Sequence, residues 1–239
     1  MAAAAESLVS KKDKRRLLHV VYRVGNLERT IQFNTEDSYD IGTGFGNFGI
    51  VVEDVQKVVD LAKATGATIS RERGPAPGKP SEMTAIFSDP DGYSFELIER
   101  SLTADPIAHV SLNVLDLEKS IEFYEKGFGL ALLSKDGVLG DEFSIARLGY
   151  GDDEKNTTTL ELRQQHGVSQ YSKGTGYAQI AVGTDDVYKT AEALRAFGGK
   201  ITREPGPLPG INTKITAVLD PDGWKSVFVD NADFSKELE

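Results

Sequence analysis

An internal repeat constrains the fold of this chain more than any other feature of its sequence. The segment LLHVVYRVGNLERTIQF (residues 17–33) resembles IAHVSLNVLDLEKSIEF (residues 107–123), and His19 aligns with His109 at an offset of 90. A repeat of this size indicates that the chain arose by duplication of a structural unit. The two halves of the chain should therefore share one architecture.

The later part of the repeat has a different offset. Residues 39–78 resemble residues 171–210, and here Asn47 aligns with Gln179 at an offset of 132. The offset has grown by 42, so about 42 residues of the second copy have no counterpart in the first. They are missing between residues 33 and 39, within the stretch QFNTEDSYDIG.

Each copy divides into two shorter units with the same order of elements. In the third unit the alternating strand HVSLNV precedes apolar residues at helix spacing (Leu117, Ile121 and Tyr124), and strand-like runs such as TTTLELR follow. In the fourth unit the strand AQIAV precedes the helix DVYKTAEALRAFG, which has acidic residues at its start and glycines at its end. The pattern predicts an α+β fold of βαβββ modules, four in ancestry, of which the first is truncated.

The repeat also predicts the domain boundaries. We expect a flexible N-terminal segment at residues 1–16, a truncated N-terminal domain at 17–103 and a C-terminal domain at 104–239. The tetrapeptide DPDG, which occurs at 89–92 and 220–223, predicts a tight turn before the last strand of a unit. The segments GPAPG and GPLPG are predicted to be loops.

Composition disfavours several classes of function. A formal charge of −10 and a pI of about 4.9 argue against binding to nucleic acid or to an anionic membrane. The chain has no cysteine, which excludes disulfides, thiolate metal sites and cysteine nucleophiles. Its N-terminus lacks the apolar core of a signal peptide, and the sequence predicts no membrane span. We therefore expect a cytoplasmic protein.

Seven segments carry a resemblance to a known family: LLHVVYRVGNLERTI, YDIGTGFGNFGIVVEDV, DPDGYSFELIER, LGYGDDEKNTTTLELR, TGYAQIAVGTDDVYKTAEA, GGKITREPGPLPGINTKITAVLDPDGWK and VDNADFSKELE. In this order they resemble the glyoxalase I (lactoylglutathione lyase) family in its fused, two-domain plant-type form, within the vicinal oxygen chelate superfamily. The resemblance implies methylglyoxal detoxification, in which the hemithioacetal of glutathione and methylglyoxal is isomerised to S-lactoylglutathione.

The resemblance further implies a metal site between the second and third units. Its candidate ligands are His109 and Glu161 from the third unit, with Asn47 and Glu96 from the second. His109 stands where relatives often have glutamine, and Asn47 stands where they have histidine. One imidazole and two carboxylates suit a single Zn²⁺, Ni²⁺ or Co²⁺ ion. Because the Asn47 amide is a weak donor, we expect lower affinity than in a site with four strong ligands.

The corresponding site between the first and fourth units is predicted to be inactive. Val227 stands where the second unit has Glu96, and the glutamate of the first unit falls in the gap. His19 and Gln179 alone would chelate a metal poorly, so we interpret His19 as a structural strand residue.

The family's reaction removes a proton from a carbon next to a carbonyl, and a divalent cation stabilises the resulting enediolate. The resemblance implies that Glu96 is the general base, and that Glu161 is the opposing ligand and a second candidate acid–base group. Without the resemblance, each glutamate is more often an edge-strand charge that faces water.

Three further residues are candidates for contact with the substrate. Lys79, in the segment PGKPSEM, could meet a carboxylate of the substrate, although a solvated loop lysine is the simpler interpretation. Asn113 stands where relatives have an arginine that binds a glutathione carboxylate, and Gln165 stands where they have an asparagine. His166 is a weaker candidate, as a displaced ligand near Glu161.

Two rival interpretations remain open. The chain could be a catalytically impaired glyoxalase-like protein that binds a metal or a glutathione conjugate, or a truncated isoform that folds poorly. A dioxygenase of the same superfamily would need two histidines and one carboxylate around iron, which the single-histidine set disfavours. Loss of most of the first unit should also expose apolar strand surface on the fourth, so we expect self-association or low stability.

Overall fold

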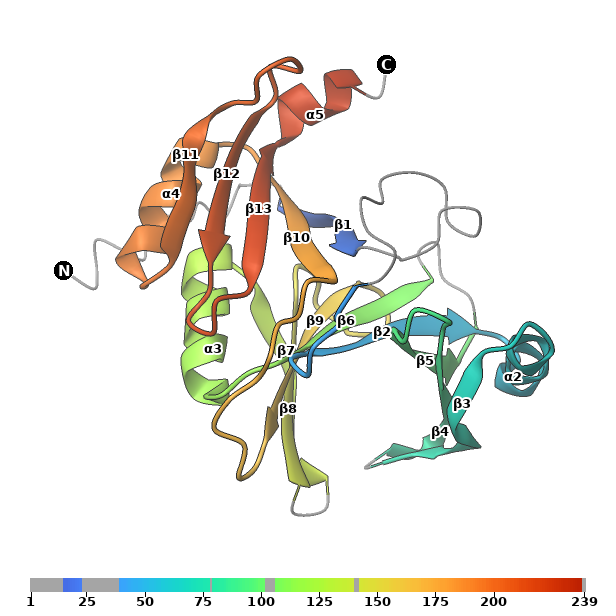
Figure 1. Ribbon diagram of the computed structural model, residues 1–239. Coiled ribbons are helices and arrows are strands. Elements are labelled where there is room, and N and C mark those ends of the chain that lie inside the picture. Colours follow the sequence, from blue (N-terminus) through green and yellow to red (C-terminus); the bar gives the residue numbers. More distant parts are fainter. Residues whose placement is uncertain (1–14, 23–38, 78, 102–105, 140–141, 238–239) are drawn as a thin grey trace. The chain divides into compact units, whose positions relative to one another are not determined.

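The protein is described by a computed structural model, which covers residues 15–22, 39–77, 79–101, 106–139 and 142–237 (Figure 1). Its strands are β1 (Arg16–Tyr22), β2 (Phe45–Val52), β3 (Thr68–Ala76), β4 (Lys79–Ser88), β5 (Ser94–Glu99), β6 (Ile107–Asn113), β7 (Ala131–Leu139), β8 (Phe143–Gly149), β9 (Thr159–Gln165), β10 (Tyr177–Thr184), β11 (Lys200–Pro207), β12 (Lys214–Leu219) and β13 (Lys225–Asp230). Its helices are α2 (Val55–Ala64), α3 (Leu117–Phe123), α4 (Val187–Ala196) and α5 (Asn231–Glu237), with a π-helical turn at Tyr124–Phe128. No helix within these ranges is long and apolar enough to cross a membrane.

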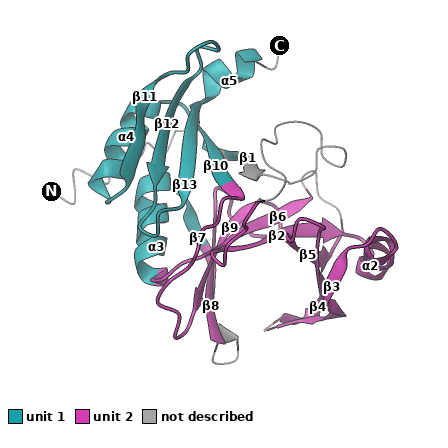
Figure 2. Cartoon of the chain, in the orientation of Figure 1, with its two compact units in different colours: residues 1–22, 118–132, 178–239 teal, residues 23–117, 133–177 magenta. Residues whose placement is uncertain are grey.

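The four βαβββ units of the repeat are called modules from here on. The chain itself forms two compact units, unit 1 and unit 2, which are coloured separately in Figure 2. Unit 1 comprises residues 1–22, 118–132 and 178–239, and unit 2 comprises residues 23–117 and 133–177. Each unit therefore combines segments from both copies of the repeat. The domain boundaries expected from the repeat follow the order of the duplicated segments along the chain, and they stay a prediction. Most of the expected flexible segment, residues 1–14, lies outside the described residues.

Unit 2 is built on an eight-stranded sheet with the order β3-β4-β5-β2-β6-β9-β8-β7. The first four strands of this order, with α2, form the second βαβββ module, and the last four belong to the third. Within each module the opening strand pairs in parallel with the closing strand, β2 with β5 and β6 with β9. The modules join edge to edge through the antiparallel pair β2–β6. The predicted α+β fold of βαβββ modules is confirmed.

Unit 1 contains a five-stranded sheet with the order β1-β10-β13-β12-β11. Strands β10 to β13 with α4 are the fourth module, in which β10 and β13 pair in parallel. Strand β1 is the opening strand of the first module, and it lies next to β10. The truncated module thus still supplies one strand to its sheet. The gap itself and the start of the first helix fall within residues 23–38, outside the described residues.

Local sequence signals set the ends of the elements. The Asp186 side chain caps α4 by accepting hydrogen bonds from the amides of Tyr188 and Lys189, and Gly198 adopts a φ of 88° just after the helix. The predicted DPDG turn is confirmed as well, because the Asp220 carboxylate accepts hydrogen bonds from the amides of Asp222 and Trp224.

The prediction that GPAPG and GPLPG are loops is wrong for their first residues. Gly74 and Pro75 continue β3 and lie opposite Thr84 and Met83 of β4, and β11 likewise extends to Pro207. Both β3 and β11 are edge strands, where a proline removes no hydrogen bond from a second neighbour. Register shifts in both pairs accommodate the irregular backbone.

The apolar face of the fourth module is covered, contrary to expectation. A cluster of Ile215, Ala217, Val227 and Val229 is buried, with exposed fractions between 3% and 8%. Leu208 and Phe234 pack against this cluster, the latter from α5. The C-terminal helix therefore shields apolar surface that the truncation was expected to expose.

Asp220 makes the stability of unit 1 depend on pH. Burial raises the pKa of its carboxyl to about 6, despite hydrogen bonds from the Trp224 amide and the Tyr124 hydroxyl. Because the pKa in the folded state exceeds that in the unfolded state, the carboxyl stabilises the fold most below pH ~4. That contribution, about 3 kcal/mol, is lost as the pH rises through about 6.

Replacing Asp220 with asparagine should therefore raise the free energy of unfolding at pH 7, by up to about 3 kcal/mol. The amide oxygen can still accept the two backbone hydrogen bonds. Urea denaturation of both proteins between pH 4 and pH 8 tests this. The difference between them should grow with pH, and a constant difference would contradict the assigned role of burial.

Candidate active site

The four candidate ligands lie on four adjacent strands at the centre of the unit 2 sheet. Glu96 is on β5, Asn47 on β2, His109 on β6 and Glu161 on β9. Gly49 lies opposite both Glu96 and His109, and Ser111 lies opposite Glu161. Because side chains alternate between the faces of a strand, this register directs all four candidates to one face of the sheet.

His109 contacts two of the other candidates. Its Nε2 atom forms a hydrogen bond of 2.8 Å with Oδ1 of Asn47 and lies 3.7 Å from Oε2 of Glu96. His109 and Asn47 are buried, with exposed fractions of 3% and 4%. Three donor atoms from three strands therefore meet at the imidazole.

Gly49 makes room for the imidazole. A Cβ atom at this position would lie 2.4 Å from both Cε1 and Nδ1 of His109, far inside van der Waals contact. The ring therefore occupies the space that a side chain on β2 would fill. In the fourth module Ala181, which lies opposite Val227, stands at the position of Gly49.

Glu161 is a buried carboxylate with a nearby guanidinium. Ser111 donates a hydrogen bond of 3.2 Å to its Oε1, and Nη2 of Arg147 lies 2.7 Å from its Oε2. The Arg147 contact is an ion pair without hydrogen-bond alignment, so buried Oε2 accepts no hydrogen bond. Burial raises the pKa of Glu161, but the charges of His109, Arg147 and Arg163 outweigh it and hold that pKa below its ordinary value.

Glu96 is more accessible than Glu161. Its side chain is 18% exposed, against 3% for Glu161. Arg71 donates a hydrogen bond of 3.0 Å to its Oε1, which leaves Oε2 on the side of His109. The two carboxylates thus differ in solvent contact, and each has its own arginine.

These side chains line a cavity in unit 2 that is rich in both signs of charge. Its charged or polar lining residues are Asn47, Arg71, Lys79, Glu82, Glu96, Arg100, His109, Asp136, Arg147, Glu154, Thr159, Glu161 and Arg163. Lys79 forms an ion pair of 2.7 Å with Glu154. Burial raises the pKa of Glu154, but hydrogen bonds from Lys79 and Ser134 dominate and lower it to about 2. Lys79 is therefore held at the cavity by a carboxylate that stays charged.

The remaining candidates lie outside the cavity lining. Asn113 and Gln165 are at the ends of β6 and β9, on the same face as His109 and Glu161 but further along the strands. The Asn113 side chain donates to the Thr43 carbonyl at 2.9 Å. His166 is exposed and lies 3.0 Å from the Ser144 hydroxyl. For the second site, Val227 is a buried residue of β13, and the side chain of His19 lies outside what the structure describes.

The donor set suits a divalent metal ion by its chemistry. It offers an imidazole nitrogen, two carboxylates and an amide oxygen, and the buried Oε2 of Glu161 accepts no hydrogen bond. Within the described residues, however, no three His, Cys, Asp or Glu side chains are arranged so that together they could hold an ion. His109, Asn47 and Glu96, three of the four donors, lie together, whereas Glu161 is paired with Arg147.

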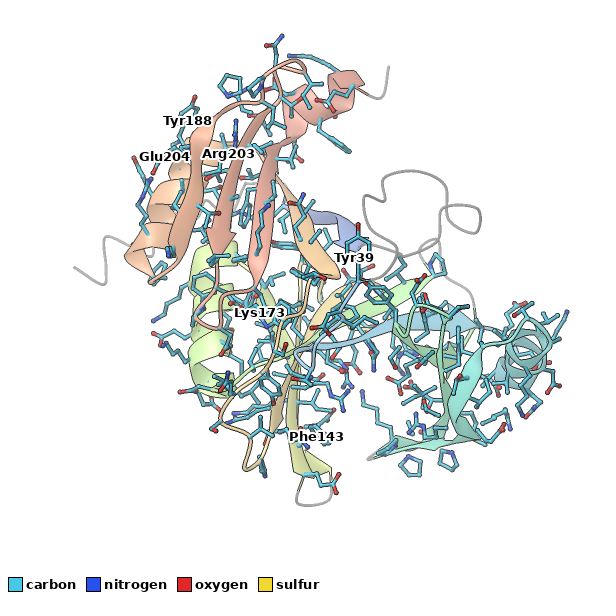
Figure 3. The ribbon with its side chains drawn as sticks, in the orientation of Figure 1. Tyr39, Phe143, Lys173, Tyr188, Arg203 and Glu204 are labelled. Carbon is cyan, nitrogen blue, oxygen red and sulfur yellow. The ribbon has the colours of Figure 1, made fainter. Side chains whose placement is uncertain are left out.

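Sequence reasoning missed the arginines. Arg71 contacts Glu96, and Arg147 lies directly opposite Glu161 in the β8–β9 pair. Arg163 lies two residues after Glu161, and its guanidinium carbon is 4.7 Å from the ring centre of Phe143, labelled in Figure 3. The alternation in SIARLG could have pointed to Arg147, because a strand that carries an arginine between buried apolar residues presents it to one face.

Paired βαβββ modules with an imidazole and two carboxylates on one face of their joint sheet define a protein of the glyoxalase type. Residues 34–97 and 106–228 match the model of the Glyoxalase/Bleomycin resistance protein/Dioxygenase superfamily, and the chain belongs to this family. Its relatives include a probable chloroplastic lactoylglutathione lyase of Arabidopsis thaliana, 52% identical over 96% of this chain and 77% of the relative. A lactoylglutathione lyase of Oryza sativa subsp. japonica is 48% identical over 96% of this chain and 94% of the relative.

Solved structures agree with this grouping. Glyoxalase I from Zea mays superimposes with a TM-score of 0.89 at 47% identity, covering 95% of this chain and 96% of the maize chain. A single-residue variant of the maize enzyme gives a TM-score of 0.92 at 46% identity, covering 98% and 100% of the two chains. Glyoxalase I enzymes depend on a metal in general, so the half-formed donor set is the feature to explain.

Proposed function

We propose that this chain is a lactoylglutathione lyase that isomerises the methylglyoxal–glutathione hemithioacetal at the cavity of unit 2. The observation that carries the proposal is the register that directs Glu96, His109 and Glu161 to one face of the central strands of the unit 2 sheet. Its kinship with lactoylglutathione lyases supports the same reaction.

Glu96 is the proposed general base. A base must reach the substrate and must be able to hold a proton during the reaction. Glu96 is partly exposed, and its Oε2 faces the cavity beside His109. Glu161 is buried against Arg147, and its lowered pKa makes it a poorer proton acceptor. We therefore assign proton transfer to Glu96. Glu161 is assigned the role of a metal ligand that stays negatively charged.

The proposed cofactor is one divalent ion, Ni²⁺, Zn²⁺ or Co²⁺, held by His109, Glu96 and Glu161 with Asn47 as a weak fourth donor. When bound, it would supply Lewis-acid stabilisation of the charge that develops on the substrate oxygens. Lys79 is the proposed contact for a glutathione carboxylate, and Asn113 and Gln165 extend the same face of β6 and β9.

Turnover with added metal tests this function. The purified chain should form thioester from the hemithioacetal when Ni²⁺ or Zn²⁺ is supplied, should lose this activity with a chelator and should regain it with fresh metal. If a folded, metal-supplemented sample forms no thioester, the rival interpretation holds, a catalytically impaired binding protein or a truncated isoform.

Replacing Asn47 with histidine should raise the metal affinity by about tenfold, because an imidazole is a far better ligand than an amide oxygen. The position is suitable since Oδ1 of Asn47 lies 2.8 Å from the His109 ring nitrogen. Calorimetric titration with Zn²⁺ measures the effect. Asn156→His, in an exposed loop, is the control for adventitious binding. Equal affinities of Asn47→His and the original protein would remove Asn47 from the site.

The cytoplasmic location and the self-association remain proposals. The Arabidopsis relative is described as chloroplastic, so a fluorescent fusion of this chain should be imaged against chloroplast markers. Light scattering tests self-association, for which the covered face of the fourth module gives no support.

A further inference from the structure

A guanidinium is the nearest cation to the most buried carboxylate of the cavity. Arg147 and Glu161 are direct cross-strand neighbours, and Nη2 lies 2.7 Å from Oε2. A buried carboxylate needs a counter-charge, since removing it from water without one costs several kcal/mol. The Arg147 guanidinium lies where it supplies that charge.

The two oxygens of Glu161 have different partners. Oε2 pairs with the Arg147 guanidinium at 2.7 Å, without an aligned hydrogen bond. The hydrogen bond to Glu161 comes instead from Ser111, which donates to the other oxygen, Oε1. Oε2 therefore remains the oxygen that another cation could take.

Arg147 also has partners to which it can move. Its Nη1 donates a hydrogen bond of 2.8 Å to Oδ2 of Asp136 and lies 3.9 Å from Oε2 of Glu154. Glu154 is fixed at the cavity by Lys79 and Ser134. If Arg147 released Glu161, its charge would remain compensated by Asp136 and Glu154.

A divalent ion and the Arg147 guanidinium compete for Oε2. A divalent ion on this oxygen would face the Arg147 charge at contact distance, where like charges repel strongly in a partly desolvated cavity. His109, Asn47 and Glu96 already meet at the imidazole. Completion of the site therefore favours exchange of the guanidinium partner of Glu161.

We propose that Arg147 is an internal competitor for the metal ion, which neutralises Glu161 in the metal-free protein and must shift to Asp136 and Glu154 for the ion to bind. The inference rests on the proposed metal site. It makes Arg147 a positioning residue that sets metal affinity, and it explains why the donors do not close around one point.

Titration of the metal-free protein with Co²⁺, followed by its visible absorption, tests the exchange without substrate. Arg147→Met should bind Co²⁺ about tenfold or more tightly than the original protein, because the competing charge is gone. Arg163→Met is the matched control. It removes the same charge from the same cavity, but Arg163 stacks on Phe143 and acts on Glu161 through its charge, whereas Arg147 also contacts Oε2. Its affinity should change much less.

A second variant moves the affinity the other way. Asp136→Asn weakens the alternative partner of Arg147, so the guanidinium should stay on Glu161 and Co²⁺ should bind several-fold more weakly. This measurement stands even if Arg147→Met does not fold. In Arg147→Met, the melting temperature should be lower without metal and should rise more with Co²⁺ than in the original protein.

The results separate this inference from the proposed function. Unchanged Co²⁺ affinity in Arg147→Met, or an equal gain in Arg163→Met, overturns the exchange even if the chain turns over the hemithioacetal. If the variants show the predicted order of Co²⁺ affinities but the original protein shows no turnover, the exchange is supported. Only the proposed enzymatic function is then contradicted.

Discussion

Replacing Glu96 with glutamine should lower kcat for the hemithioacetal by about 10³-fold, within the range that a general base contributes. Glutamine keeps the size of the side chain and can still accept a hydrogen bond from Arg71, but it cannot take a proton. Substrate binding does not depend on that proton transfer, so KM should change little.

Glu99→Gln is the matched control for this change. Glu99 is on the same strand but pairs with Arg73 outside the cavity, so its replacement should leave kcat nearly unchanged. Stopped-flow or steady-state thioester formation at saturating metal measures both variants. Comparable kcat values for Glu96→Gln and Glu99→Gln would remove Glu96 from the chemistry.

Replacing Gly49 with alanine should displace the His109 imidazole. The new methyl group would lie 2.4 Å from two ring atoms of a side chain that is 3% exposed and packed against Asn47. Overpacking of this kind costs about 1–3 kcal/mol of unfolding free energy. The ring nitrogen would also leave its partners, so Co²⁺ affinity and activity should fall together.

The double variant Gly49→Ala, His109→Gln tests whether the collision with the imidazole causes the loss of stability. If the ring and the methyl group collide, the slimmer glutamine should recover part of the lost stability, and the two changes should be non-additive. Gly206→Ala, where a Cβ meets nothing within 4 Å, controls for the change of residue type. Strict additivity in urea denaturation would show that the collision does not determine the loss.

The repeat predicted the fold because each module repeats one order of strands and helices. The resemblance to the glyoxalase I family implied that the second and third modules are partners, and their opening and closing strands carry Asn47, Glu96, His109 and Glu161 to one sheet face. The pattern also indicated what the truncation spared, since β1 still lies beside β10.

The charge contacts could not be predicted in the same way. The partner of Glu161 depends on the β8–β9 register, and that of Glu96 on an arginine two strands away on β3. The bulged pairing between β2 and β6 that places Gly49 opposite His109 is also invisible in a linear sequence. The C-terminal helix was not expected to cover the fourth module, because the sequence does not show that the chain folds back after β13 so that Phe234 packs against Val229 and Ile215.

Anomalous diffraction from crystals soaked in Co²⁺ or Zn²⁺ tests the central claim most directly. We predict one strong peak in unit 2, within bonding distance of His109 Nε2 and of a carboxylate oxygen from each of Glu96 and Glu161, with Arg147 moved away from Glu161. A peak elsewhere, or a metal-soaked crystal with no peak at these three side chains, would contradict the site.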